Sequence, residues 1–119
     1  DLDVVTVSAS SGEGKRAAVF GRFEMGVQSD DGYSPIGWVG TGFSDSDLVN
    51  LTNTLRKNVE SFKGNVYSVL PRVVLQVSAD VVTRDSDGNI GLRFPRVTRI
   101  RDDKFAQDVN TLEEVERMI

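Results

Sequence analysis

The sequence contains no cysteine and no histidine. The first absence excludes disulfides and metal sites built on thiolates. The second removes the commonest general base, the commonest neutral metal ligand and every nucleophile that histidine activates. No apolar run approaches the roughly 20 residues of a membrane span, and the acidic opening is unlike a signal peptide. We therefore expect no metal site and no membrane partner.

Length and composition predict one globular domain. The 119 residues are 39% hydrophobic and 27% charged, which is ordinary for a folded chain with one modest core. The first residue is not methionine, and the opening residues already have the pattern of a strand. We expect residues 1–119 to be a single domain taken from a longer protein.

The charge is unevenly distributed along the chain. The net charge is −4, yet the segment from Arg93 to Lys104 contains five basic and two acidic residues. A positive stripe on a negative body is typical of a phosphate-binding surface. The alternative is a solvated strand edge protected by charged side chains.

Hydrophobic periodicity predicts a mainly β fold. Alternating patterns indicate five strands, over residues 2–9, 16–27, 35–43, 72–82 and 91–101. Helical spacing indicates one helix over 45–62 and a short C-terminal helix up to 119. Capping boxes at Ser44 and Thr111 support both helix starts. Five strands with a helix between the third and fourth is the order of the Greek-key barrel known as the OB-fold.

Two glycine-containing loops invite a ligand interpretation. Gly40 to Phe43 precedes a helix N-terminus, where anions bind, but it lacks the lysine of a phosphate-binding loop. A plain strand-to-helix turn is the alternative. Asp85 to Asn89 resembles the start of a calcium loop, but the terminal glutamate and the required length are missing, so we expect a turn.

The basic stripe contains two chemically distinct parts. Phe94 lies between arginines, an arrangement suited to insertion beside sugars or bases, whereas packing in the core is the alternative. Further on, Asp102 and Asp103 are adjacent and would face opposite ways in a strand, which argues against an acid–base pair. Arg101 and Lys104 flank them, so two cations could order phosphates while a carboxylate holds one of them.

Three segments carry a resemblance to one family. Gly37 to Leu48 resembles the Val-Gly-Thr-Gly-Phe-x-Asp-x-x-Leu segment of ATP-dependent DNA ligases. Leu92 to Lys104 resembles the Leu-Arg-Phe-Pro-Arg-x-x-Arg-x-Arg-x-Asp-Lys segment, which ends in nucleotidyltransferase motif VI. Leu2 to Val5 resembles the strand that follows motif V. The chain thus resembles the C-terminal OB-fold domain of an archaeal or bacterial enzyme of this family.

The resemblance implies an activity that this chain could not perform alone. Such ligases attach AMP to a lysine, transfer it to the 5′-phosphate of a nick and seal the nick with the 3′-hydroxyl. The lysine belongs to a Lys-x-Asp-Gly motif of the preceding domain, which is absent here. The implied cofactors are ATP and Mg²⁺, held mainly by that absent domain.

The implied partners are nicked duplex DNA, the ligase's own nucleotidyltransferase domain and, through other regions, a sliding clamp. The implied location is the prokaryotic cytoplasm. The alternatives are a stand-alone OB-fold that binds single-stranded nucleic acid, or the same domain of an RNA ligase or capping enzyme.

The resemblance also assigns roles to residues. Arg101, Asp103 and Lys104 match the Arg-x-Asp-Lys of motif VI, which in the family meets the β- and γ-phosphates of ATP. Arg93 and Phe94 match the pair that lies against the minor groove near the nick. The implied DNA-binding set further contains Arg96, Arg99, Thr41 and Gly42.

Overall fold

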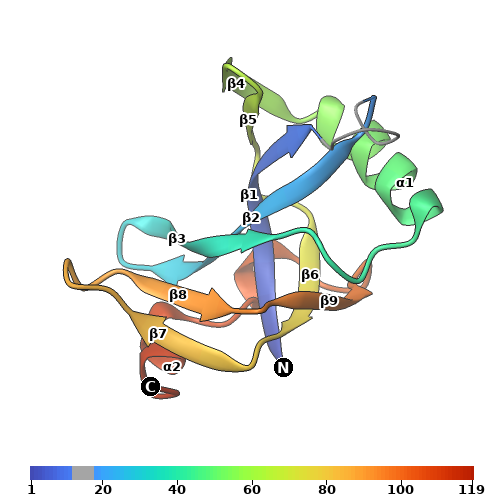
Figure 1. The fold of residues 1–119 in the computed structure, drawn as a ribbon. Coiled ribbons are helices and arrows are strands. Elements are labelled where there is room, and N and C mark those ends of the chain that lie inside the picture. Colours follow the sequence, from blue (N-terminus) through green and yellow to red (C-terminus); the bar gives the residue numbers. More distant parts are fainter. Residues whose placement is uncertain (12–17) are drawn as a thin grey trace.

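The computed structural model describes residues 1–11 and 18–119 (Figure 1). This part of the chain forms nine strands: β1 (Leu2–Ser11), β2 (Phe20–Ser29), β3 (Gly32–Val39), β4 (Val59–Lys63), β5 (Val66–Val69), β6 (Val74–Ser78), β7 (Val81–Arg84), β8 (Ile90–Arg93) and β9 (Arg96–Ile100). It also forms two α-helices and one short 3₁₀ helix: α1 (Asp45–Arg56), α2 (Leu112–Glu116) and η2 (Ala106–Asp108).

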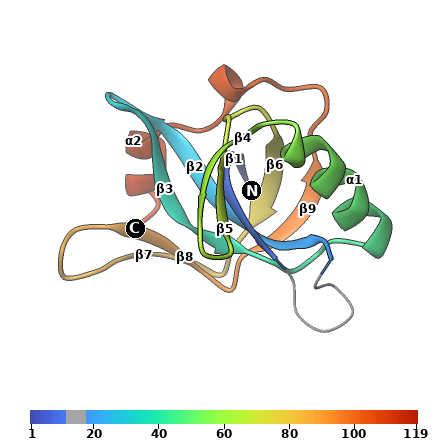
Figure 2. The ribbon, with the colours of Figure 1, turned by 90° about the horizontal axis from the view of Figure 1, so that it is seen from above.

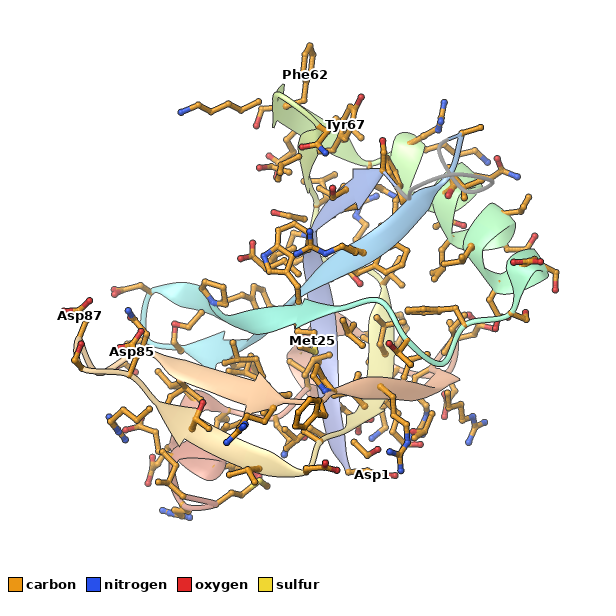
Figure 3. The ribbon with its side chains drawn as sticks, in the orientation of Figure 1. Asp1, Met25, Phe62, Tyr67, Asp85 and Asp87 are labelled. Atoms are coloured by element: carbon orange, nitrogen blue, oxygen red, sulfur yellow. The ribbon has the colours of Figure 1, made fainter. Side chains whose placement is uncertain are left out.

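Five of these strands form the expected barrel. The antiparallel path β3-β2-β1 continues from β1 to β6 and from β6 to β9. The Val97 N–H on β9 donates to the Thr41 carbonyl just after β3, at 2.8 Å, and this bond brings the two ends of the path together. Buried side chains such as Phe23, Met25 and Leu75 fill the interior, where Figure 3 places Met25. The mainly β class and the OB-fold arrangement are confirmed.

The helix α1 is shorter than its hydrophobic spacing predicts. It begins at the predicted cap, where the Ser44 side chain accepts from the Asp47 N–H. It ends at Arg56, and residues 59–62 of the expected helix belong to the strand β4. The pairing of β4 with β5 decides this, because Val59 and Phe62 fit helical spacing as well as a strand. The β4–β5 hairpin projects from the barrel, carrying Phe62 and Tyr67 (Figure 3).

Two further predicted strands are each divided into two. The strand expected over 72–82 separates into β6 and β7, and the one expected over 91–101 separates into β8 and β9. Pro95 explains the second break, because proline has no N–H for a strand ladder. β7 and β8 pair with each other in a separate two-stranded sheet. The predicted count of five strands is therefore too low for the described residues, although five of them make the barrel.

Other boundaries shift by a few residues. β3 runs from Gly32 to Val39 rather than over 35–43, because the glycine-rich end is a turn. Ser10 and Ser11 belong to β1, which therefore extends past its predicted end at residue 9, and the residues that follow, 12–17, lie outside the described part. The expected start of the second strand at 16 also lies outside it. The cap at Thr111 is confirmed, but α2 ends at Glu116, short of 119.

The two α-helices lie on opposite sides of the barrel (Figure 2). α1 buries Leu48, Leu51 and Leu55 in the core. Thr52 is also buried, and its hydroxyl is satisfied because it accepts from the Phe20 N–H and donates to the Leu48 carbonyl. These contacts fix α1 beside β2 and leave the opposite face of the helix toward solvent.

Candidate phosphate and nucleic-acid interface

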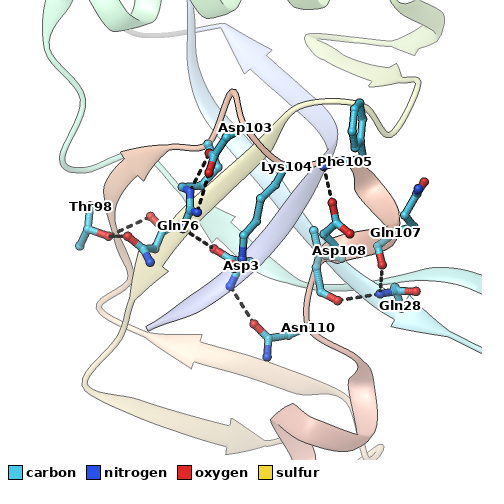
Figure 4. A network of polar contacts seen from close by, with 12 residues as sticks. Asp3, Gln28, Gln76, Thr98, Asp103, Lys104, Phe105, Gln107, Asp108 and Asn110 are labelled. Carbon is cyan, nitrogen blue, oxygen red and sulfur yellow. Dashed lines mark hydrogen bonds and ion pairs between the residues drawn. The ribbon is translucent and has the colours of Figure 1, made fainter.

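A charged network joins the two ends of the chain. The segment after β9 places Lys104 Nζ 2.5 Å from Asp3 Oδ2 on β1 (Figure 4). Arg101 donates from Nε and Nη2 to both oxygens of Asp103, at 3.0 and 2.9 Å. Its Nη1 also lies 3.8 Å from Asp3 Oδ1. Two cations and two carboxylates are thus interlocked within one small region.

Electrostatics keeps this network charged. The two hydrogen bonds from Arg101 hold the pKa of the Asp103 carboxyl well below its ordinary value. The same hydrogen bonds to Asp103 raise the pKa of Arg101. The Arg101 side chain is only 14% exposed, whereas that of Asp103 is 56% exposed. The Arg101 guanidinium is therefore held by hydrogen bonds to the Asp103 carboxylate, and that carboxylate is itself exposed to solvent.

The backbone fixes the position of these side chains. The Arg101 N–H donates to the Val74 carbonyl on β6 at 2.9 Å. Downstream, the Asn110 N–H donates to the Asp3 carbonyl, and the Asp3 N–H donates back to the Asn110 side chain at 2.8 Å. The segment between these anchors is consequently held against β1, with Lys104 over Asp3.

The expectation that a carboxylate holds one of the two cations is met by Asp103 and Arg101. Sequence reasoning missed Asp3, the partner of Lys104. Asp3 is separated from Lys104 by 101 residues. Nothing in the local sequence indicates this pairing, because it arises only when β1 and the segment after β9 are packed together.

An irregularity in β9 sets the direction of two predicted DNA-binding arginines. Arg96 pairs with Ser78 and Arg99 with Gln76, so that Thr98 is an extra residue in β9. Residues three apart face opposite ways in a regular strand, but a bulge between them restores the same face. Arg96 and Arg99 are both exposed and lie on one face. The Thr98 hydroxyl donates to the Gln76 carbonyl at 3.2 Å and steadies the bulge.

Phe94 lies at the corner between β8 and β9. Its side chain is 69% exposed, so the alternative of core packing is wrong. Its φ is 51°, in the left-handed region, which costs a non-glycine residue about 1–3 kcal/mol. The guanidinium carbon of Arg93 lies 5.6 Å from the centre of the Phe94 ring. An exposed ring, a strained backbone and an adjacent cation occur together here, which is typical of a contact surface.

Thr41 and Gly42 have a structural task in this region. The Thr41 carbonyl accepts the Val97 N–H that closes the barrel. Gly42 has a φ of +100°, and a Cβ placed there would lie 2.2 Å from the Val97 carbonyl oxygen. Both residues are exposed, and Gly42 lines a groove of about 390 Å³ that Arg99 and Asp102 also line. Their packing supports the strand-to-helix turn predicted as the alternative to an anion loop.

The acidic turn at Asp85 is a backbone feature. The Asp85 carboxylate accepts from the Asp87 and Asn89 N–H groups, each at 2.9 Å, at the tip of the β7–β8 hairpin (Figure 3). These bonds lower the pKa of Asp85. Within residues 1–11 and 18–119, no group of three or more acidic side chains could hold a metal ion. Arg101 and Lys104 have the charge to bind phosphates, and among the described residues no such group of carboxylates lies with them to hold Mg²⁺.

No helix in the described part of the chain is long and apolar enough to span a membrane.

Comparisons with known proteins point to one family. Residues 16–104 match the family described as the C terminal region of ATP dependent DNA ligase. A DNA ligase of Methanospirillum hungatei is 40% identical over 97% of this chain, and one of Halorubrum lacusprofundi is 42% identical over 98%. The chain spans only about a fifth of the length of these relatives, 21% and 20% respectively.

Solved structures share the fold. The ligase domain of LigD from M. tuberculosis superimposes with a TM-score of 0.77 and 25% identity, over 91% of this chain and 37% of that one. A mycobacterial DNA ligase D complexed with ATP and MES superimposes with a TM-score of 0.72 and 23% identity, over 92% of this chain and 37% of that one.

Proposed function

Because the chain belongs to the family of C-terminal domains of ATP-dependent DNA ligases, we propose that it acts in two stages of the reaction: self-adenylylation of the enzyme, and the two later steps on nicked DNA. It follows a nucleotidyltransferase domain that supplies the reactive lysine, and residues 1–119 form one domain of that longer enzyme. The observation that carries the proposal is the family match over residues 16–104. Nicked duplex DNA is the substrate, and the cytoplasm of a prokaryotic cell is the location.

In the first stage, Arg101 and Lys104 bind the outer phosphates of ATP. ATP supplies the AMP group and leaves pyrophosphate, whose negative charge two nearby cations stabilise. Asp103 positions Arg101 through two hydrogen bonds, and Asp3 neutralises Lys104 until a phosphate takes its place. The fixed geometry supports this role, because preorganised cations need no rearrangement when the charge develops.

In the second stage, the domain turns and presents the corner around Phe94 to DNA. Arg93 and Phe94 lie against the minor groove near the nick, while Arg96 and Arg99 contact phosphates on either side. The exposure of these side chains and the shared face of the two arginines support the assignment. Gly42 contributes backbone to the groove that Arg99 also lines, and Thr41 precedes it in the chain.

Other partners follow from the same assignment. The domain contacts its own nucleotidyltransferase domain in the first stage, since the reactive lysine lies there. A sliding clamp would bind through other regions of the enzyme. A stand-alone module for single strands is not favoured, because the relatives that match nearly the whole chain are named DNA ligases.

Deleting the domain from the enzyme tests this function. The ligase without residues 1–119 should lose self-adenylylation and the sealing of nicked duplex, and the intact enzyme should prefer nicked duplex to single strands. The two losses are measured by transfer of labelled AMP to the protein and by product length on a gel. Undiminished sealing by the truncated enzyme would contradict the proposal.

A further inference from the structure

A groove of about 590 Å³ lies next to the charged network. The end of α1, the connection from β5 to β6 and the segment after β9 form its walls. Three cations line it, Arg72, Arg101 and Lys104, against the single carboxylate of Asp102. Its volume falls within the range of about 300–1,000 Å³ that small-molecule sites occupy.

The three cations differ in how their charge is compensated. Arg101 is held by Asp103, and Lys104 by Asp3. Arg72 is exposed, and no carboxylate among the described residues lies within ion-pair distance of it. A phosphate that binds Arg72 therefore has no carboxylate to displace, whereas binding to Arg101 or Lys104 must compete with one.

A neutral partner orients Arg72. Its Nη1 donates to Asn58 Oδ1 at 3.3 Å. Asn58 is fixed in turn by two hydrogen bonds. Its side-chain amide donates to the Thr54 carbonyl at 2.9 Å, and its backbone carbonyl accepts from the Leu70 N–H at 2.8 Å. The guanidinium is thus directed by a group without charge, and four of its five N–H donors remain available.

We propose that Arg72 is a third phosphate-binding cation of this groove and that it binds the triphosphate of ATP during self-adenylylation. The inference rests on the function proposed above for Arg101 and Lys104. Arg72 lines the same groove as both, although it comes from a part of the chain about 30 residues earlier. Its planar fork suits two phosphate oxygens at once, which a lysine would not provide.

Kinetics of the complete ligase test the proposal. For Arg72→Ala, the KM for ATP in self-adenylylation should rise about tenfold, which is typical for the loss of a charge-assisted hydrogen bond. The kcat should change much less, because Arg72 contributes to binding more than to the chemical step. Arg72→Lys should recover part of the affinity, because it restores the charge without the fork.

Two further variants separate charge from position. Lys57 lies at the end of α1 and does not line the groove, so Lys57→Ala removes a nearby positive charge from outside it. This variant should leave the KM for ATP unchanged. Asn58→Asp gives Arg72 a carboxylate partner and should also raise the KM, although Arg72 itself is still present. Thermal unfolding of each variant shows whether a change reflects misfolding, and Arg72→Lys still decides the question if Arg72→Ala does not fold.

The source of the phosphate is decided by a second assay. Sealing of nicks that are already adenylylated should not change in Arg72→Ala. If Arg72→Ala lost nick binding while its KM for ATP was unchanged, Arg72 would be assigned to DNA and the proposal would be overturned. A KM for ATP in Arg72→Ala equal to that of Lys57→Ala would also overturn it. Arg101→Ala and Lys104→Ala are measured in parallel. If these two slow adenylylation and Arg72→Ala does not, only this inference fails; if none does, the proposed function fails.

Discussion

The segment from Arg93 to Lys104 has two halves, and they differ in whether the cations are paired with carboxylates. In the second half, Arg101 and Lys104 are paired with carboxylates of their own domain. In the first half, Arg96 and Arg99 are exposed, and no carboxylate of the described residues lies within ion-pair distance of either. Phe94 is exposed between them and the β8 strand.

Under the function proposed above, this difference corresponds to two ways of preparing a cation to bind a phosphate. Paired cations are held in place before the ligand arrives, which suits a reaction that depends on geometry. Unpaired exposed cations give affinity that depends on salt, which suits a long polyanion approached from several directions. One stripe of positive charge in the sequence therefore corresponds to two surfaces.

Arg101→Ala should have the largest effect of the changes considered, and it concerns the second half of the segment. In the complete ligase we expect self-adenylylation to fall about 100-fold, the effect of removing one preorganised donor from a transition state. Sealing of pre-adenylylated nicks should be nearly unchanged. Both rates are measured on the same preparation, with Arg101→Lys as the control that keeps charge but loses the fork. An equal loss in both assays would contradict the assignment of Arg101 to self-adenylylation alone.

Gly42→Ala should disturb the packing of the loop after β3 against β9 without changing any charge. A Cβ there meets the Val97 carbonyl, and the backbone has a positive φ, so we expect a loss of about 2 kcal/mol in the free energy of unfolding. Gly88→Ala is the matched control, because Gly88 has a φ of +87° but no atom near its Cβ position. Urea unfolding measures both. Equal losses would mean that the contact with Val97 contributes nothing.

Phe94→Ala tests the contribution of the exposed ring in the first half of the segment. We expect nick sealing to fall about tenfold, as stacking or wedging contacts of one aromatic contribute roughly 1–3 kcal/mol. Self-adenylylation and the unfolding temperature should not change, since the ring lies outside the core. Phe62→Ala, another exposed phenylalanine at 71%, is the control. Unchanged sealing in Phe94→Ala would remove this residue from the DNA surface.

The pH dependence of stability should give the smallest effect. Arg101 lowers the pKa of Asp103, so their interaction contributes stability above the ordinary carboxyl pKa near 4 and loses it as pH falls through the lowered value. Wild type should therefore unfold at a higher temperature than Asp103→Asn at pH 7. That gap should narrow below about pH 4. A constant gap from pH 7 to pH 2 would contradict the assignment.

The sequence was sufficient to predict the barrel class, the two helix caps and the segments that form the candidate surfaces. These features depend on local signals: alternation, capping residues and motif spacing. The β4–β5 hairpin was not predictable in this way, because Val59 and Phe62 fit a helix as well as a strand, and only pairing with β5 decides between them.

Two parts of the candidate site were also beyond local signals. The bulge at Thr98 turns Arg96 and Arg99 to one face, and it depends on the register with β6. The pairing of Lys104 with Asp3 depends on the contact between segments 101 residues apart. Long-range packing, rather than residue type, therefore determines which cations are free and which are held.

The salt dependence of binding to nicked duplex DNA distinguishes the two halves of the segment from Arg93 to Lys104. The slope of log K against log salt concentration counts the phosphates that a protein neutralises, at about 0.9 per contact. In the complete ligase, the double change of Arg96→Ala and Arg99→Ala should reduce the magnitude of this slope by roughly two. Lys104→Ala should leave it unchanged. An equal reduction by Lys104→Ala would contradict the claim that the two halves serve different phosphates.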